Sequence, residues 1–200
     1  MFIRWISKLK ITLFSPTTIM ATEYELKVLN IDVEALKGKL NSLWAEKQTK
    51  KKLRRYVYDM NPPQKDKRIR LRTDGQTTTL TVKHIIDEHA IDGVKEWEVL
   101  VDDFDQMNSV LEQLGFKEKG YQENIRESFL LDDCSLEIDS RPHIPTYLEI
   151  EWPSEESVLK MLKKLGLENE LITSENTMSV YLRYWKDIKD YKILSFDTEK

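Results

Sequence analysis

Charged and apolar residues alternate along a short segment near the start of the chain. Glu23, Glu25 and Lys27 occupy every second position, and an aromatic or aliphatic residue follows each of them. A period of two is the side-chain period of a β-strand, so the segment is predicted to be a strand with one charged and one apolar face. That charged face either lies in water at the edge of a sheet or belongs to a site for metal and phosphate.

The same alternation recurs in almost every later segment that reads as a strand. The charged residues at these alternating positions are Arg68, Arg70, Arg72, Lys83, Glu96, Glu98, Arg126, Glu137, Asp139, Glu149 and Glu151. Their signs separate by segment, and arginine and glutamate dominate. A face in water tolerates any mixture of polar residues, whereas arginine suits bidentate phosphate contacts and carboxylates suit metal ions. The pattern therefore favours a functional face over a solvated one.

The order of the segments predicts one α+β domain that is predominantly β. Strands are expected at 23–28, 48–59, 67–72, 77–86, 95–101, 121–131, 135–140 and 146–152, with helices at 33–44, 103–114, 154–165 and 176–187. Asp74-Gly75 between the third and fourth strands is a strong hairpin signal. Eight antiparallel strands usually close or stack to hide their edges, which predicts a closed tunnel with flanking helices. Charges inside it would need ion pairs, metal ions or a polyanion to offset their desolvation.

Composition excludes several classes of site. The single cysteine, Cys134, cannot form an internal disulfide, and His84, His89 and His143 do not combine with it at zinc-binding spacing. No glycine-rich phosphate loop of the GxxxxGK[ST] or GxGxxG type is present. The formal net charge of -4 gives no global attraction to nucleic acid or to an anionic membrane. We expect a cytoplasmic protein that binds neither.

Two basic segments leave alternatives open. Residues 1–20 carry Arg4, Lys8 and Lys10 among apolar residues, so they form either an interfacial amphipathic helix or sequence upstream of a true start at Met20. We favour the second and divide the chain into an extension over 1–20, a domain over 21–186 and a polar tail over 187–200. The run 50–55 is a solvated strand edge or a nucleic-acid patch, although no aromatic residues are interleaved with it.

Taken in order, these motifs resemble the CYTH domain. They are the ExExK of residues 23–27, the RxR of 70–72, the lysine of 80–83, the ExE of 96–98, Arg126, LEID at 136–139 and YLEIE at 147–151. Each motif is weak alone, but their joint order from Thr22 to about Tyr184 is specific. The CYTH superfamily, the triphosphate tunnel metalloenzymes, is named for class IV adenylyl cyclases and thiamine triphosphatases. The resemblance implies an eight-stranded tunnel that binds a triphosphate and divalent metal.

The resemblance also implies roles for individual residues. The phosphates would be bound by Lys27, Arg70, Arg72, Lys83 and Arg126. Mg²⁺ or Mn²⁺ would be held by carboxylates drawn from Glu23, Glu25, Glu96, Glu98, Asp139, Glu149 and Glu151. Lys27 and Glu149 are predicted to be catalytic. Two positions depart from the family pattern: Asn124 replaces a basic residue, and 144–146 replace a glycine-containing turn at the tunnel mouth, where the rest of the substrate is expected.

Three functions follow from the resemblance. The first is metal-dependent hydrolysis of inorganic triphosphate, thiamine triphosphate or a nucleoside triphosphate. The second is an adenylyl cyclase that converts ATP to cyclic AMP and pyrophosphate, and the third is a module that binds polyphosphate without catalysis. The expected partner is a small triphosphate substrate, and the sequence leaves a homodimer open.

Overall fold

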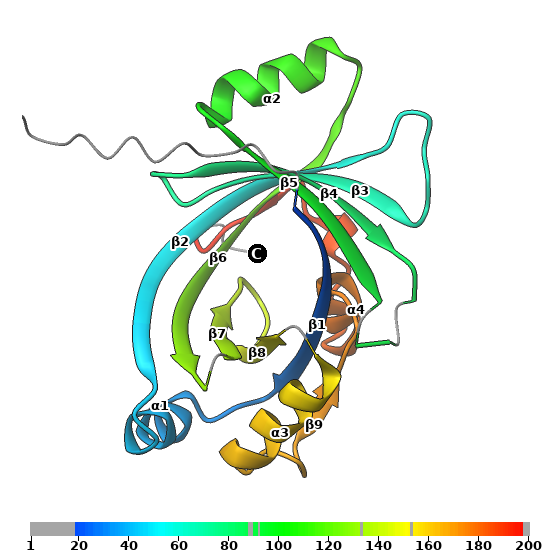
Figure 1. Cartoon of the computed structure of the whole chain (residues 1–200). Helices are drawn as coiled ribbons and strands as arrows, with labels where there is room; N and C mark the ends of the chain where they lie inside the picture. The colour runs from blue at the N-terminus through cyan, green and yellow to red at the C-terminus, as the bar shows by residue number, and fades with distance from the viewer. Residues whose placement is uncertain (1–18, 88–89, 92, 133, 153, 198–200) are drawn as a thin grey trace, which may run out of the picture.

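The fold is a ring of paired β-strands with helices on its outside (Figure 1). This computed structural model describes residues 19–87, 90–91, 93–132, 134–152 and 154–197, with side chains described from Tyr24 onward and not at Trp152. The predicted extension over 1–20 therefore lies almost entirely outside the described residues. None of the described helices is long and apolar enough to cross a membrane.

Eight strands form the ring. They are β1 (Ile19–Leu29), β2 (Glu46–Asp59), β3 (Lys67–Thr73), β4 (Thr78–Ile85), β5 (Val94–Val101), β6 (Glu118–Leu131), β7 (Cys134–Ser140) and β8 (Tyr147–Trp152). Pairing runs in the order β6-β2-β3-β4-β5-β1-β8-β7, and β7 pairs with β6 again, so the circuit returns to its first strand. All of these pairs are antiparallel. The predicted eight-stranded antiparallel tunnel is confirmed.

Two short strands were not predicted from the sequence. β9 (Leu171–Thr173) pairs with the end of β1, and β10 (Ile193–Leu194) pairs in parallel with β6. Segments of two and three residues carry no visible periodicity, which is why the sequence does not reveal them. The last helical segment also differs, because α4 (Thr177–Arg183) ends four residues before the predicted end and is followed by a short 3₁₀ turn at Ile188–Asp190.

Helices cover the apolar outer face of the ring. α1 (Val33–Ser42) and α3 (Glu155–Leu165) lie beneath β1, β7 and β8 in Figure 1. Their side chains share a core with Leu26, Val28, Leu136, Leu148 and Ile150. α2 (Phe104–Gln113) covers the outer face of β3, where Phe104 and Leu111 pack on Ile69 and Leu71. Since neighbours along a strand point to opposite faces, the charged residues between these apolar ones point into the ring.

Local sequence fixes where these elements begin and turn. The Asp32 carboxylate accepts hydrogen bonds from the backbone N–H groups of Glu34 (3.1 Å) and Ala35 (3.0 Å), which caps α1. Ser154 caps α3 in the same way. In the turn between β3 and β4, Gly75 adopts a φ of +88°, which glycine tolerates without steric cost. The Asp-Gly hairpin is therefore confirmed.

A separate apolar cluster covers one end of the ring. Ile144, in the loop between β7 and β8, packs with Tyr147, with Val180 and Tyr181 of α4, and with Leu194 of β10. The Tyr181 hydroxyl donates a hydrogen bond of 2.8 Å to the backbone carbonyl of Pro142 in the same loop. This end of the barrel is thus occupied by packed side chains from the C-terminal part of the chain.

We predict that replacing Leu148 with alanine lowers the free energy of unfolding by about 2–5 kcal/mol, because the Leu148 side chain is fully buried in the α1–α3 core and its removal leaves a cavity. The free energy of unfolding should be measured by urea denaturation. Leu159→Ala is the matched control, because Leu159 lies on α3 with nearly half of its surface exposed. A loss in Leu148→Ala no larger than in the control would contradict this packing.

Candidate functional site

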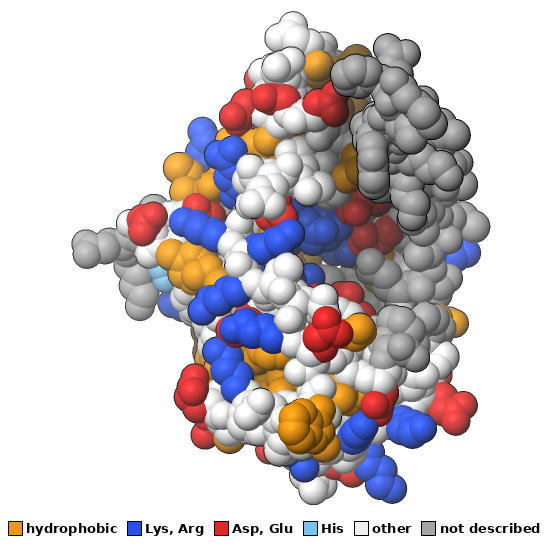
Figure 2. All heavy atoms as spheres, turned by 60° about the vertical axis from the view of Figure 1, so that its left-hand side comes forward, with side chains coloured by type: hydrophobic (Ala, Val, Ile, Leu, Met, Phe, Trp, Pro, Cys, Tyr) orange, Lys and Arg blue, Asp and Glu red, His pale blue; other side chains and the backbone are white. Residues whose placement is uncertain are grey.

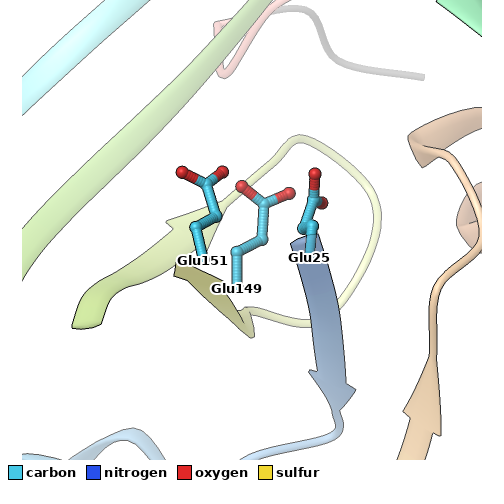
Figure 3. A group of neighbouring side chains, drawn as sticks. All are labelled: Glu25, Glu149 and Glu151. Carbon is cyan, nitrogen blue, oxygen red and sulfur yellow. The ribbon is translucent and has the colours of Figure 1, made fainter. Parts of the chain in front are cut away.

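Three carboxylates converge inside the barrel. Glu25 lies on β1 beside Glu151 of β8, and Lys27 lies beside Glu149 in the same register. Carboxylate oxygens of Glu25, Glu149 and Glu151 all lie within 4.8 Å of one another. Figure 3 shows the three side chains rising side by side from the two strands with their carboxylates turned the same way. The strand pairing therefore brings together acids that are more than 120 positions apart in the sequence.

Lys27 holds this acidic cluster together. Its ammonium forms an ion pair with Glu25 and lies 3.8 Å from a Glu149 oxygen. Burial opposes the ionisation of Glu25, but the charges of Lys27, Lys83 and Arg126, with Lys27 the strongest, outweigh it and lower the pKa of Glu25 to about 2. Burial raises the pKa of Glu149, and the neighbouring Glu25 carboxylate raises it further, although Arg126 opposes the rise. The pKa of Glu149 therefore stays raised even though Lys27 and Arg126 both lie beside the cluster.

This cluster has the chemistry of a divalent metal site. Carboxylate oxygens are hard ligands of the kind that Mg²⁺ prefers, and Mg²⁺ is usually bound through a few carboxylates together with substrate phosphates. The raised pKa of Glu149, caused by burial and by the crowding of Glu25 and Asp139, is the behaviour of acids that a further cation would stabilise. Glu25, Glu149 and Glu151 therefore fit a divalent cation. The side chain of the predicted ligand Glu23 lies outside the described part of the chain.

The opposite wall of the barrel is basic. Arg70 on β3 lies 3.3 Å from Glu96 and 3.4 Å from Glu98, both on β5, and Lys83 on β4 forms an ion pair with Glu96. Arg72 lies 3.9 Å from Glu98. Glu96 and Glu98 are thus engaged with the predicted phosphate-binding residues and lie outside the acidic cluster. Glu96 and Glu98 hold Arg70, Arg72 and Lys83 in place. These three cations lie on the other side of the interior from Glu149 and Glu151.

Arg126 on β6 is a basic residue that lies among the acidic residues of β7 and β8. Its guanidinium forms an ion pair with Glu149, and it lies 3.4 Å from Asp139 and 3.7 Å from Glu137. The burial of the group, which would lower the pKa of Arg126, is outweighed by Asp139 and Glu149, and the pKa rises well above the usual range. Arg126 therefore stays charged beside the acidic cluster, where an incoming phosphate oxygen could take a place among its partners.

Asp139 is fully buried and bound by protein donors. Its Oδ2 accepts hydrogen bonds from Arg141 (2.8 Å) and from the Tyr147 hydroxyl (3.3 Å), and its Oδ1 accepts one from Asn124 (2.5 Å). Burial opposes its ionisation, but Arg141 and Arg126 lower the pKa of Asp139 far below its usual range. Asp139 therefore orients Arg126 and Asn124, and it does not join the cluster of Glu25, Glu149 and Glu151.

Two arginines of the interior are not among the predicted site residues. Arg141 is buried and donates to Asp139 and, over 2.6 Å, to the Tyr147 hydroxyl. Arg55 lies beside Arg72 on the inner face of β2 and donates a hydrogen bond of 2.7 Å to Asn124. It forms no ion pair with any residue that the structure describes, and its Nε is buried without a hydrogen-bond partner. Arg141 continues the period-two pattern of Glu137 and Asp139, and this signal could have identified it.

A cavity of about 320 Å³ opens beside these groups. It is lined by the basic residues Arg72, Arg126 and Lys51, by the acids Asp74 and Glu137, and by Leu53, Ser128 and several threonines. Figure 2 shows basic and acidic side chains next to one another within a hollow of the surface. The arrangement can bind a compact polyanion between the basic wall and the acidic cluster.

Comparisons with known proteins agree with this geometry. The family model of the CYTH domain matches residues 21–180. A comparison with curated protein sequences finds no match. A conserved protein from Pyrococcus furiosus has a similar structure, with a TM-score of 0.68 and 24% identity over 78% of this chain and 97% of its own.

Two further solved structures have the same fold. A candidate adenylate cyclase from Vibrio parahaemolyticus gives a TM-score of 0.62 at 16% identity, over 73% of this chain and 89% of its own. A candidate adenylyl cyclase from Hippeastrum with a dominant triphosphatase activity gives 0.53 at 16% identity, over 82% of this chain and 95% of its own. At these identities the likeness concerns the fold.

We predict that Arg141→Met lowers the free energy of unfolding by about 3–5 kcal/mol, because Asp139 would remain buried without its nearest cation. Urea denaturation measures the change. Lys164→Met, which breaks the exposed Lys164–Asp132 pair, is the control and should cost less than about 1 kcal/mol. Similar losses in both variants would show that Arg141 does not stabilise a buried charge.

Proposed function

Because the chain belongs to the CYTH domain family, we propose that it is a divalent-metal-dependent phosphohydrolase that acts on a triphosphate compound inside its barrel. The observation that supports this most is the arrangement of the interior, in which three clustered carboxylates face a wall of arginine and lysine side chains. A triphosphate with its metal ion carries both signs of charge and matches both walls. We place this activity in the cytoplasm, in keeping with the single buried cysteine.

The proposed metal site consists of Glu25, Glu149 and Glu151. A bound Mg²⁺ or Mn²⁺ would neutralise charge on the phosphate oxygens and lower the pKa of a bound water. Lys27 positions two of these carboxylates, because it lies between Glu25 and Glu149. This is the role we assign to Lys27, alongside its predicted contact with phosphate.

The basic residues supply the rest of the proposed mechanism. Arg70, Arg72, Lys83 and Arg126 would hold the phosphate chain extended between the two walls and stabilise the charge on the transferred phosphoryl group. Water adds to the terminal phosphorus, the bond from that phosphorus to its bridging oxygen breaks, and orthophosphate leaves together with the shortened chain. Glu96 and Glu98 keep Arg70 and Lys83 oriented before the substrate arrives.

The direct experiment incubates the purified protein with ATP, thiamine triphosphate and tripolyphosphate, each with Mg²⁺ or Mn²⁺. Orthophosphate, pyrophosphate and cyclic AMP are then resolved and quantified. The proposal predicts orthophosphate from at least one substrate, and no release after chelation of the metal. Cyclic AMP with pyrophosphate would instead establish an adenylyl cyclase. Binding without turnover would establish a non-catalytic module.

We predict that Glu149→Gln and Arg70→Ala each reduce turnover at least about a hundredfold, the scale expected when one electrostatic stabiliser of a transition state is lost. Initial rates of orthophosphate release measure the effect, and circular dichroism checks that each variant is folded. Glu156→Gln, on the exposed first turn of α3, is the matched control and should retain full activity. Near-normal rates in both site variants would refute the assigned site.

A further inference from the structure

The apolar outer face of the sheet continues past α2 onto β5. Trp97 and Val99 lie on this outer face, because they alternate with the inward residues Glu96 and Glu98. The cluster of side chains packed under α2 includes residues of β2, β3 and β4, and Val101 from β5, but neither Trp97 nor Val99. Val99 is 47% exposed, and Trp97 is partly buried. These two apolar side chains therefore lie beside α2 and not beneath it.

α2 has an apolar edge on the same side. Asn108 accepts a hydrogen bond from the Tyr58 hydroxyl, so the edge of the helix that carries Asn108 lies over β2. By the helical period, Met107, Val110 and Leu114 lie on the opposite edge, toward β4 and β5. Met107 packs in the cluster under the helix, whereas Val110 is 49% and Leu114 63% exposed. We call Trp97, Val99, Val110 and Leu114 together the α2–β5 surface.

Acidic residues surround the α2–β5 surface. Residues 102–113 contain no lysine or arginine and four exposed acids, Asp102, Asp103, Asp105 and Glu112. Basic residues lie at the margins: Arg54 over the Phe104 ring on the β2 side, Lys95 two positions before Trp97 on β5, and Lys117 beyond the end of α2. An apolar partner that also carries positive charge would complement this surface. Exposed apolar side chains that gather with a polar rim are typical of an interaction site.

The first strand begins next to this surface. Ile19, the first residue of β1, pairs with Glu98 of β5, and Met20 pairs with Trp97. Neighbouring strands lie about 4.8 Å apart. The start of β1 is therefore one strand spacing from Glu98, which is adjacent in sequence to Val99. Residues 1–18 are attached to the barrel at this point.

The sequence of residues 1–18 complements the α2–β5 surface. Apolar residues recur at helical spacing on one face, and basic residues accompany them without any acid: the apolar ones are Phe2, Ile6, Leu9 and Leu13, and the basic ones are Arg4, Lys8 and Lys10. A helix over residues 2–13 would be about 18 Å long, and the ten residues of α2 span about 15 Å. Length, apolar face and charge thus all match.

We propose that residues 1–18 bind within the same molecule to the α2–β5 surface, with Phe2, Ile6, Leu9 and Leu13 against its apolar side chains and the basic residues beside the acids of 102–113. This gives the extension a place in the folded protein, instead of the interpretation that the chain starts at Met20. The inference is independent of the proposed function, because it involves neither the interior of the barrel nor a metal.

The test places a nitroxide spin label on α2 of the isotope-labelled full chain and records the amide NMR signals of residues 2–13. The label is attached to Gln106→Cys, an exposed position on α2, and the native Cys134 is buried. We expect these signals to lose at least about half of their intensity. The same label at Leu159→Cys on α3, which lies at the opposite end of the barrel from α2 in Figure 1, should leave them unchanged.

Two pairs of matched variants, each with the label on α2, test the contact itself. Leu9→Glu disrupts the apolar face of the segment, and Ile11→Glu makes the same change on its other face. Val110→Glu disrupts the α2–β5 surface, and Ser109→Glu adds the same charge at the exposed neighbouring position. We expect the intensity loss to disappear in Leu9→Glu and Val110→Glu and to persist in the two controls. Because an added acid attracts a basic segment, loss of contact in Val110→Glu would report the apolar contact.

The other possible occupants give different results. A mixture of spin-labelled unlabelled-isotope protein with isotope-labelled protein lacking the spin label reports contacts between molecules. Intensity loss of equal size in that mixture would identify a second copy as the occupant and overturn the proposal. Full intensity in every sample would also overturn it. Full intensity together with sedimentation of the protein on vesicles of phosphatidylserine and phosphatidylcholine would assign the segment to a membrane surface instead.

Discussion

The interior of this barrel depends on the mutual compensation of buried charges. Closing eight alternating strands into a ring puts one face of every strand inside, and here that face carries arginine, lysine, glutamate and aspartate. Each isolated charge would cost several kcal/mol to bury. Lys27 and Arg126 reduce this cost, because each contacts acids from more than one strand. These ion pairs therefore offset part of the cost of closing the ring.

The compensation is uneven, and the proposed function follows from this unevenness. Glu25, Glu149 and Glu151 crowd together, with Lys27 paired to Glu25 and Arg126 paired to Glu149. On β2, Arg55 has an amide partner but forms no ion pair with a described residue. An excess of negative charge at one place and of positive charge at another is the arrangement that a metal–phosphate complex would neutralise. Buried ion pairs between strands also preorganise these side chains, so that little reorganisation is needed when a polyanion binds.

The sequence predicts much of this because alternation is a local property. The strands, the Asp74-Gly75 turn and the inner position of Arg70, Arg72 and Lys83 all follow from period-two spacing and turn chemistry. Partnership across the ring is not local, since it depends on strand order and register. For this reason the sequence could not separate Glu96 and Glu98, which hold Arg70, from the clustered Glu149 and Glu151. Lys51 and Arg55 belong to a basic run of the sequence. Only the pairing of β2 shows which residues of that run face the interior.

A crystal structure of the protein with tripolyphosphate and Mn²⁺ would show directly where the metal and the phosphates bind. Anomalous scattering would locate the metal independently of the phosphate density. We expect Mn²⁺ bound to oxygens of Glu25, Glu149 and Glu151, with the phosphate chain extending past Arg126 and Arg72. Phosphate on the outer face of β2, at Lys52 and Arg54, with no metal inside the barrel, would contradict it.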